Sequence, residues 1–210
     1  MFVVLFEVQP KREQWDRYLE LAAMLRPELL EVRGFIDNER YSSERTEGRL
    51  LSLSTWEDEK ALVRWRTQAR HHDVQRQGRF EVFEDYHLRV GEVLSDSDEE
   101  DLPHSRLDLT GVSAAPAVTV TETLAEGKLS LARPQRTLLD AESYDGITVA
   151  GKRLMLASWL SDEAAGAWIE RQPAGARQRH LRVIRDYGMH QREEAPQYFP
   201  AMDVVSNAGE

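Results

Sequence analysis

The chain has 210 residues, a formal net charge of −10 and no cysteine. The acidic excess argues against general nucleic-acid binding and against docking on anionic lipid, because both need surplus Lys and Arg. The lack of cysteine excludes disulfides, thiolate nucleophiles and zinc–thiolate or iron–sulfur sites.

The chain begins with a short apolar run from Phe2 to Phe6, which Glu7 interrupts. A membrane helix needs about 20 apolar residues, and a signal peptide needs a basic segment before its apolar core. The run therefore predicts a strand over residues 2–8. We expect a cytoplasmic protein that does not contact a membrane.

Hydrophobic periodicity predicts the other elements of the first half. Apolar residues at helical spacing indicate one helix over 12–31 and a second over 58–77, which Gly78 ends. Alternating patterns indicate strands over 35–44, 50–56 and 81–94. The order β-α-β-β-α-β is that of a ferredoxin-like unit, an antiparallel sheet with both helices on one face.

Residues 95–105 carry half of the net charge in five acidic side chains and show no apolar periodicity. Such a segment is typical of an exposed linker, although a recognition tail or a metal-chelating loop is an alternative. It divides the chain into a domain over 1–94, a second domain over 106–200 and a C-terminal tail over 201–210.

The two halves share a pattern of tryptophans. Trp56 matches Trp159 and Trp65 matches Trp168, both at a spacing of 103 residues. Because tryptophan is rare, this common register indicates a tandem duplication. The Asp-Tyr pairs at 85–86 and 186–187 match at 101, which suggests a two-residue deletion between them.

The second half repeats the element order in degraded form. Its first strand is expected over 117–124, and only a partial helix over 131–136, because Pro134 interrupts that segment. The fold class is therefore α+β, with two tandem ferredoxin-like domains packed sheet to sheet as a pseudo-dimer, as in a dimeric α/β barrel. Each unit would keep a pocket between its sheet and its helices.

The predicted helix over 58–77 carries the most side chains that could form a functional site. On one continuous helix Trp65 and His72 share the face that meets the sheet, whereas His71 points well away. This pair could line a cleft for a flat aromatic ligand. The alternative is that Trp65 belongs to the core and His72 is a hydrogen-bonded residue at its edge.

Further candidates lie near this helix. Arg79 could reach an anionic group, or could simply be a solvated cation beside a helix end. Tyr41 and Tyr86 lie on predicted strands and could line either the cleft or the interface between the sheets. No GxGxxG, GxxxxGK, HExxH or GxSxG motif is present, and no metal site is expected.

Residues 1–94 resemble antibiotic biosynthesis monooxygenase (ABM) domain proteins. The segments that carry the resemblance are FVVLFEVQP, GFIDNERYSSE, LLSLSTWEDEKALVRWR, HHDVQRQGR and EDYHLRV, and the second half is similar to a diverged copy. The resemblance implies the dimeric ferredoxin-like fold. Family membership alone does not establish catalysis.

The resemblance implies that O₂ oxidises a small aromatic, quinol-like substrate with no cofactor. Trp65 and His72, with Tyr41 and Tyr86, are the catalytic candidates. The substrate-binding candidates are Asn38, Trp56, Arg79 and Trp168.

Two alternatives remain open. One is a haem-degrading monooxygenase with His72 as axial ligand, although Glu7 occupies the position where such relatives have an asparagine. The other is a non-catalytic ligand-binding or stress protein. Two tandem chains could also pair as a homodimer.

Overall fold

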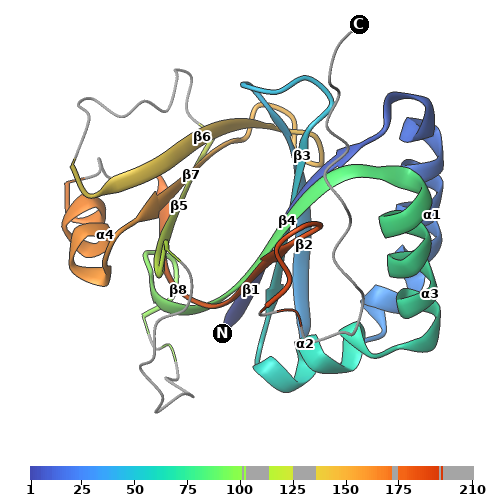
Figure 1. The fold of residues 1–210 in the computed structure, drawn as a ribbon. Coiled ribbons are helices and arrows are strands. Elements are labelled where there is room, and N and C mark those ends of the chain that lie inside the picture. The colour runs from blue at the N-terminus through green and yellow to red at the C-terminus, as the bar shows by residue number, and fades with distance from the viewer. Residues whose placement is uncertain (101, 103–113, 125–135, 172–174, 194, 196–210) are drawn as a thin grey trace, which may run out of the picture.

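The computed structural model describes residues 1–100, 102, 114–124, 136–171, 175–193 and 195. In these residues eight antiparallel strands close into one barrel, in the order β1-β3-β2-β6-β7-β5-β8-β4. The helices lie outside the barrel, with α1, α2 and α3 on one flank and α4 on the opposite flank (Figure 1). None of the helices in this part of the chain is long and apolar enough to span a membrane.

The first half forms four strands and three α-helices. Its elements are β1 (Phe2–Pro10), α1 (Trp15–Leu30), β2 (Phe35–Ser43), β3 (Leu50–Trp56), α2 (Glu59–Arg66), α3 (Ala69–Gln77) and β4 (Phe83–Asp96). A 3-10 turn (Arg12–Gln14) precedes α1, and a π-helical turn, η2 (Gly78–Val82), joins α3 to β4.

The described part of the second half forms four strands and one helix. They are β5 (Ala117–Thr123), β6 (Leu138–Gly146), β7 (Arg153–Trp159), α4 (Asp162–Ile169) and β8 (Arg177–Gly188). Within each half the neighbouring strands are ordered 4-1-3-2, and the second half runs around the barrel in the opposite sense, so that the halves join through β2–β6 and β4–β8. The α+β class, the ferredoxin-like order and the barrel expected from the sequence are confirmed.

The predicted helix over 58–77 is wrong as a single element. Helix α2 ends at Arg66, where the Thr67 hydroxyl donates back to the Val63 carbonyl, and Gln68 is extended with φ −61° and ψ 134°. A threonine side chain that bonds the preceding turn competes with helix continuation. Helix α3 starts in a new direction, so side-chain positions after the break do not follow the 100° rule.

The strand register also corrects one match between the halves. Leu5 pairs with Arg89, and Val120, which occupies the same place in β5, pairs with Arg179. The last strands therefore correspond at a spacing of 90 residues, and the Asp-Tyr pairs do not occupy equivalent places. The difference arises because only residues 170–176 separate α4 from β8, a segment too short for counterparts of both α3 and η2.

The acidic segment is only partly an exposed linker. Strand β4 continues to Asp96, whose buried carboxylate accepts hydrogen bonds from Arg177 at 3.0, 3.3 and 2.7 Å. The expected exposure of Asp96 is therefore wrong, because its charge is neutralised by an arginine of β8. The expected helix over 131–136, most of the linker and the tail over 201–210 lie outside the described residues.

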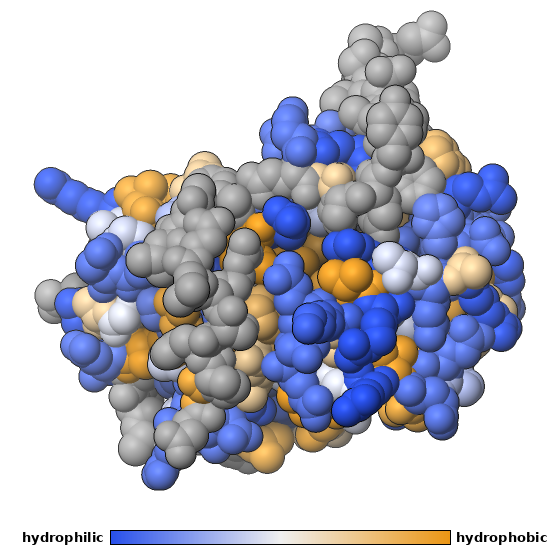
Figure 2. Space-filling view, turned by 90° about the horizontal axis from the view of Figure 1, so that it is seen from below, coloured by the Kyte–Doolittle hydropathy of each residue, from blue (hydrophilic) through white to orange (hydrophobic). Residues whose placement is uncertain are grey.

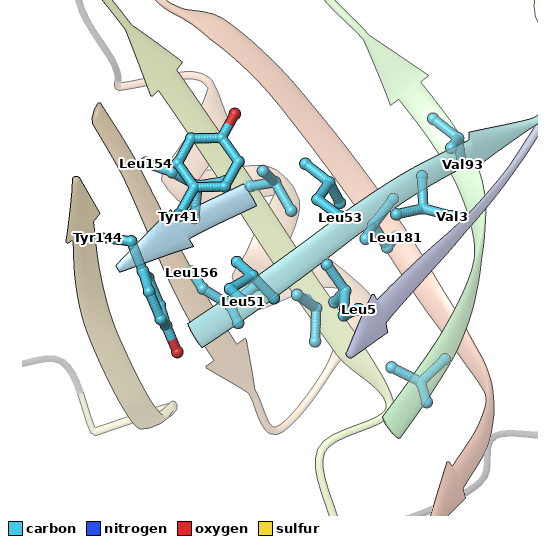
Figure 3. Close-up of a cluster of buried hydrophobic side chains, with 13 residues drawn as sticks. Val3, Leu5, Tyr41, Leu51, Leu53, Val93, Tyr144, Leu154, Leu156 and Leu181 are labelled. Atoms are coloured by element: carbon cyan, nitrogen blue, oxygen red, sulfur yellow. The ribbon is translucent and has the colours of Figure 1, made fainter. Parts of the chain in front are cut away.

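The barrel interior is an apolar core to which both halves contribute. Val3 and Leu5 of β1 and Leu154 and Leu156 of β7 belong to one cluster, which also includes Tyr41 and Tyr144 (Figure 3). Both tyrosines are fully buried. Alternation along each strand explains this, because every second residue points inward.

Two buried clusters, each centred on a carboxylate, connect the two halves within this interior. Tyr144 of the second half donates to Glu7 at 2.9 Å, and Arg89 bonds Glu7 at 2.7 Å and Ser158 at 2.8 Å. At the equivalent places, Tyr41 donates to Glu122 at 2.7 Å. A buried carboxylate is stable only when charged and polar partners surround it, so each cluster requires residues of both halves.

One residue at the seam predicts a pH dependence of folding stability. His87 of β4 contacts Asp186 of β8 at 2.5 Å and Glu7 at 3.4 Å. Burial and Arg89 oppose the imidazolium, yet hydrogen bonds to Asp186 and Glu7 raise the pKa of His87 to about 9. Because the pKa of His87 is higher in the folded state, protonated His87 stabilises the fold fully below pH of about 6.5. This contribution is lost as the pH rises through about 9.

We expect the urea midpoint of unfolding to fall between pH 7 and about 9.5, and the His87→Gln variant to lose most of this decline. His72→Gln, a change at an exposed histidine of α3, is the matched control and should keep the wild-type slope. An unchanged pH profile in the His87→Gln variant would contradict this assignment.

Candidate functional site

A cavity of about 250 Å³ lies between the helices of the first half and the outer face of the barrel. Its floor is made by outward-facing residues of β1, β3 and β4, such as Val4, Phe6 and Leu88. Its roof is made by α1, α2 and α3, with Leu21, Leu25 and other apolar side chains. On the face seen in Figure 2 hydrophilic residues dominate and hydrophobic ones form small patches between them. Because its floor and roof carry many apolar side chains, the cavity can bury a small apolar molecule.

The polar lining of the cavity is strongly cationic. Asn38, Ser52 and Ser54 form a neutral polar strip on the floor, where Asn38 donates to Ser52 at 2.9 Å and to the Leu53 carbonyl at 3.1 Å. No aspartate or glutamate lines the cavity among the described residues. Six arginines do: Arg26, Arg40, Arg66, Arg79, Arg185 and Arg192.

Trp65 and His71 form one wall of the cavity. Their rings stack with centroids 4.2 Å apart and an interplanar angle of 18°. Nδ1 of His71 lies 3.0 Å from the Trp65 carbonyl, which can only accept, so Nδ1 carries the proton and Nε2 keeps its lone pair. Burial lowers the pKa of His71 to about 4, so the ring is neutral near pH 7 and can accept a proton.

The break between α2 and α3 creates this stack. Because α3 starts afresh at Ala69, His71 turns back over Trp65 and the exposed side chain of His72 does not line the cavity. The predicted orientations of the two histidines are therefore reversed. The sequence carried the signal in Thr67 and Gln68, but continuous periodicity concealed it.

A second polar cluster closes the far end of the cavity. The Tyr86 hydroxyl accepts from Arg79 at 2.7 Å and from Arg192 at 2.6 Å. Arg79 is buried in the π-helical turn and also donates to the Met189 carbonyl at 2.9 Å. Gly78 permits this turn, because a Cβ there would lie 2.5 Å from the Phe83 ring. Burial lowers the pKa of Arg79, and the nearby Arg192 lowers it further.

Five of the eight predicted site residues line this cavity. They are Asn38, Trp56, Trp65, Arg79 and Tyr86. They come from β2, β3, α2, the π-helical turn and β4, and the ferredoxin-like order brings those elements together.

Three predicted site residues lie elsewhere. Tyr41 points into the barrel, where it contacts Glu39 and Glu122, and His72 is exposed on α3. Trp168 is buried against Trp159 at a centroid distance of 5.6 Å, on the opposite flank. Haem ligation by His72 does not fit this cavity, because the side chain does not enter it.

Several residues that line the cavity were not predicted from the sequence. Arg40 lies two positions after Asn38 on one strand face, and Arg66 follows Trp65, so both had a local signal. Arg185, Tyr187 and Arg192 had none, because they reach the cavity only when β8 pairs with β4.

Comparison with known proteins identifies the family of this chain. The family model described as "Antibiotic biosynthesis monooxygenase" matches residues 1–77. A curated protein from Pyricularia oryzae, "Jasmonate monooxygenase ABM", is 40% identical over 223 residues, covering 95% of this chain and 99% of the relative. The chain belongs to the antibiotic biosynthesis monooxygenase family.

Two solved structures are similar to this ABM-family protein. An anthrone oxidase-like protein is 14% identical, covers 89% of this chain and 92% of its own, and has a TM-score of 0.37. A conserved protein from Methanosarcina mazei Go1 is 21% identical, covers 42% of this chain and 88% of its own, and has a TM-score of 0.40.

The Trp65–His71 stack predicts an unusual titration for an ABM-family histidine. We expect NMR to show His71 neutral down to about pH 4, and Trp65→Ala to raise its pKa toward the ordinary value of about 6.5, because water reaches the ring. Trp168→Ala removes the matching tryptophan of the other half and should leave His71 unchanged. Titration of wild-type His71 near pH 6.5 would refute the stacked, desolvated environment.

Proposed function

We propose that this ABM-family protein is a monooxygenase that places a small, largely apolar substrate of the jasmonate type in the cavity beneath α1, α2 and α3. The single observation that carries the proposal is this cavity, in which an apolar body and a cationic polar lining coincide. Jasmonate is a cyclopentanone with an apolar side chain and a carboxylate, so its chemistry matches both parts of the lining. The 40% identical relative bears this substrate in its name.

The residues at the wall suggest how the protein assists oxidation. His71 lines the cavity as a neutral, desolvated imidazole, and its Nε2 can accept a proton from an acidic C–H or O–H group. The resulting anion is a far better electron donor to O₂ than the neutral substrate. Trp65 fixes the His71 ring and, with the apolar residues of α1, excludes water from the reacting centre.

The number of electrons that the substrate supplies to O₂ distinguishes two reactions. Oxidation of an activated CH₂ group to a carbonyl with release of water consumes one O₂, and the substrate supplies all four electrons. Hydroxylation of a C–H group with release of water also consumes one O₂, but needs two further electrons from a reductant. The first reaction requires no bound cofactor, and we propose that the protein works without one.

A quinol or anthrone is the second candidate substrate. The flat wall made by the stacked rings of Trp65 and His71 favours it, because aromatic ligands pack well against such a surface. Its hydroxyl or CH₂ group is more acidic than the C–H groups of jasmonate, so proton transfer to His71 costs less. This alternative keeps the same cavity and the same base.

The test measures oxygen uptake and ¹⁸O incorporation with jasmonic acid and with a panel of quinols and anthrones, each with and without a nicotinamide reductant. His71→Gln should lower kcat by about 10²- to 10⁴-fold, the usual contribution of a general base. His72→Gln, at the adjacent exposed residue, should retain wild-type activity.

The reverse result, with loss of activity only in His72→Gln, would restore the assignment made from the sequence. Absence of ¹⁸O from every product would overturn the monooxygenase proposal and favour a ligand-binding protein. Product formation only with added reductant would show that the electrons do not come from the substrate.

A further inference from the structure

The arginines of the cavity are not evenly spread. Arg66 lies in the last turn of α2, Arg185 and Tyr187 lie on the outward face of β8, and Arg192 follows that strand. Arg192 lies over the Tyr187 ring at 5.6 Å. Arg79, which bonds Tyr86, is the fourth guanidinium group at this end of the cavity, which we call the β8 end.

Three of these arginines act on the ionisation of Tyr187. Burial raises the pKa of Tyr187 to about 12 and Tyr86 adds to the effect, whereas Arg66, Arg192 and Arg185 oppose it. Like charges grouped at a partly buried site repel one another unless an anion neutralises them. Among the described residues, no carboxylate lines this end of the cavity.

The four arginines differ in what they already bind. The Tyr86 hydroxyl and the carbonyls of Gly188 and Met189 occupy Arg79 and Arg192. In the described part of the chain, no side-chain oxygen or carbonyl accepts from the guanidinium of Arg66 or of Arg185. These two cations are therefore the pair available to an anion that enters the cavity.

We propose that Arg66 and Arg185 form a carboxylate subsite, which holds the acid group of the substrate while its apolar body extends toward Trp65 and α1. Guanidinium groups bind carboxylates through paired, charge-assisted hydrogen bonds. The inference rests on the proposed function for the choice of acid. It adds that the substrate must be an anion and names the residues that select it.

The subsite also assigns a role to the second half of the chain. Arg66 comes from the first half and Arg185 from β8 of the second, so the cavity is complete only when β4 and β8 pair. In the second half the tryptophan equivalent to Trp65 is buried against Trp159. The second half therefore supplies the anion-binding wall for the site of the first.

The test compares jasmonic acid with methyl jasmonate, which has the same body without the charge, by isothermal titration calorimetry. Wild type should bind the acid at least tenfold more tightly than the ester, because charge-assisted hydrogen bonds contribute more than neutral ones. Arg185→Met and Arg66→Met should each lose this preference and bind the ester as before. Arg185→Lys should keep part of it.

Arg76→Met is the matched control, since it removes one arginine charge from the exposed face of α3 without touching the cavity. Ester binding also reports whether each variant retains its fold, and Arg66→Met tests the subsite independently if Arg185→Met does not fold. Equal binding of acid and ester by wild type would overturn the subsite. An equal loss for both probes in the arginine variants would do the same.

The subsite and the proposed function can fail separately. Turnover of jasmonic acid with no preference for acid over ester would remove the subsite and leave the monooxygenase. Arginine-dependent binding of the acid without incorporation of ¹⁸O would leave the subsite and remove the monooxygenase.

Discussion

The two buried carboxylates inside the barrel, each bonded by residues of both halves, are the constraint on which the rest of the structure depends. Glu7 is held by Arg89 of its own half and by Tyr144 of the other, and Glu122 is held in the same way by Arg179 and Tyr41. A buried carboxylate that lost these partners would be strongly destabilising. The two halves therefore form one closed barrel, and the pairing of β4 with β8 follows from that closure.

That closure determines what the outer cavity can do. Strand β8 crosses from the second half to the floor of the first half's cavity and brings Arg185 and Tyr187 with it. Helices α1, α2 and α3 supply the apolar roof, and the break after α2 sets His71 against Trp65. The cavity thus offers a neutral base beside an aromatic wall, together with a group of arginines. A small molecule with an acidic group at one end and an oxidisable centre at the other matches both.

The two halves differ in a way that the barrel tolerates. The barrel interior keeps equivalent partners in both, such as Thr55 and Ser158, which bond Arg179 and Arg89. The outer faces differ, because Trp65 lines a cavity whereas Trp168 is buried against Trp159. Interior charges need a fixed geometry to remain paired, while an outer face can exchange a cavity for packed apolar side chains at little cost to closure.

The sequence by itself determined the ferredoxin-like order of the first half, apart from the break in its second helix, and five residues of the cavity, because hydrophobic periodicity is a local signal. It also placed Tyr41 on a strand, but only closure of the barrel decided that the Tyr41 side chain points into the interior. Only the tertiary structure decided which histidine enters the cavity, because the Thr67 side chain ends α2 and redirects the chain. Only strand pairing between the halves brought Arg185 to the cavity that Arg66 also lines, since residues so far apart in sequence meet through the closed sheet and leave no local pattern.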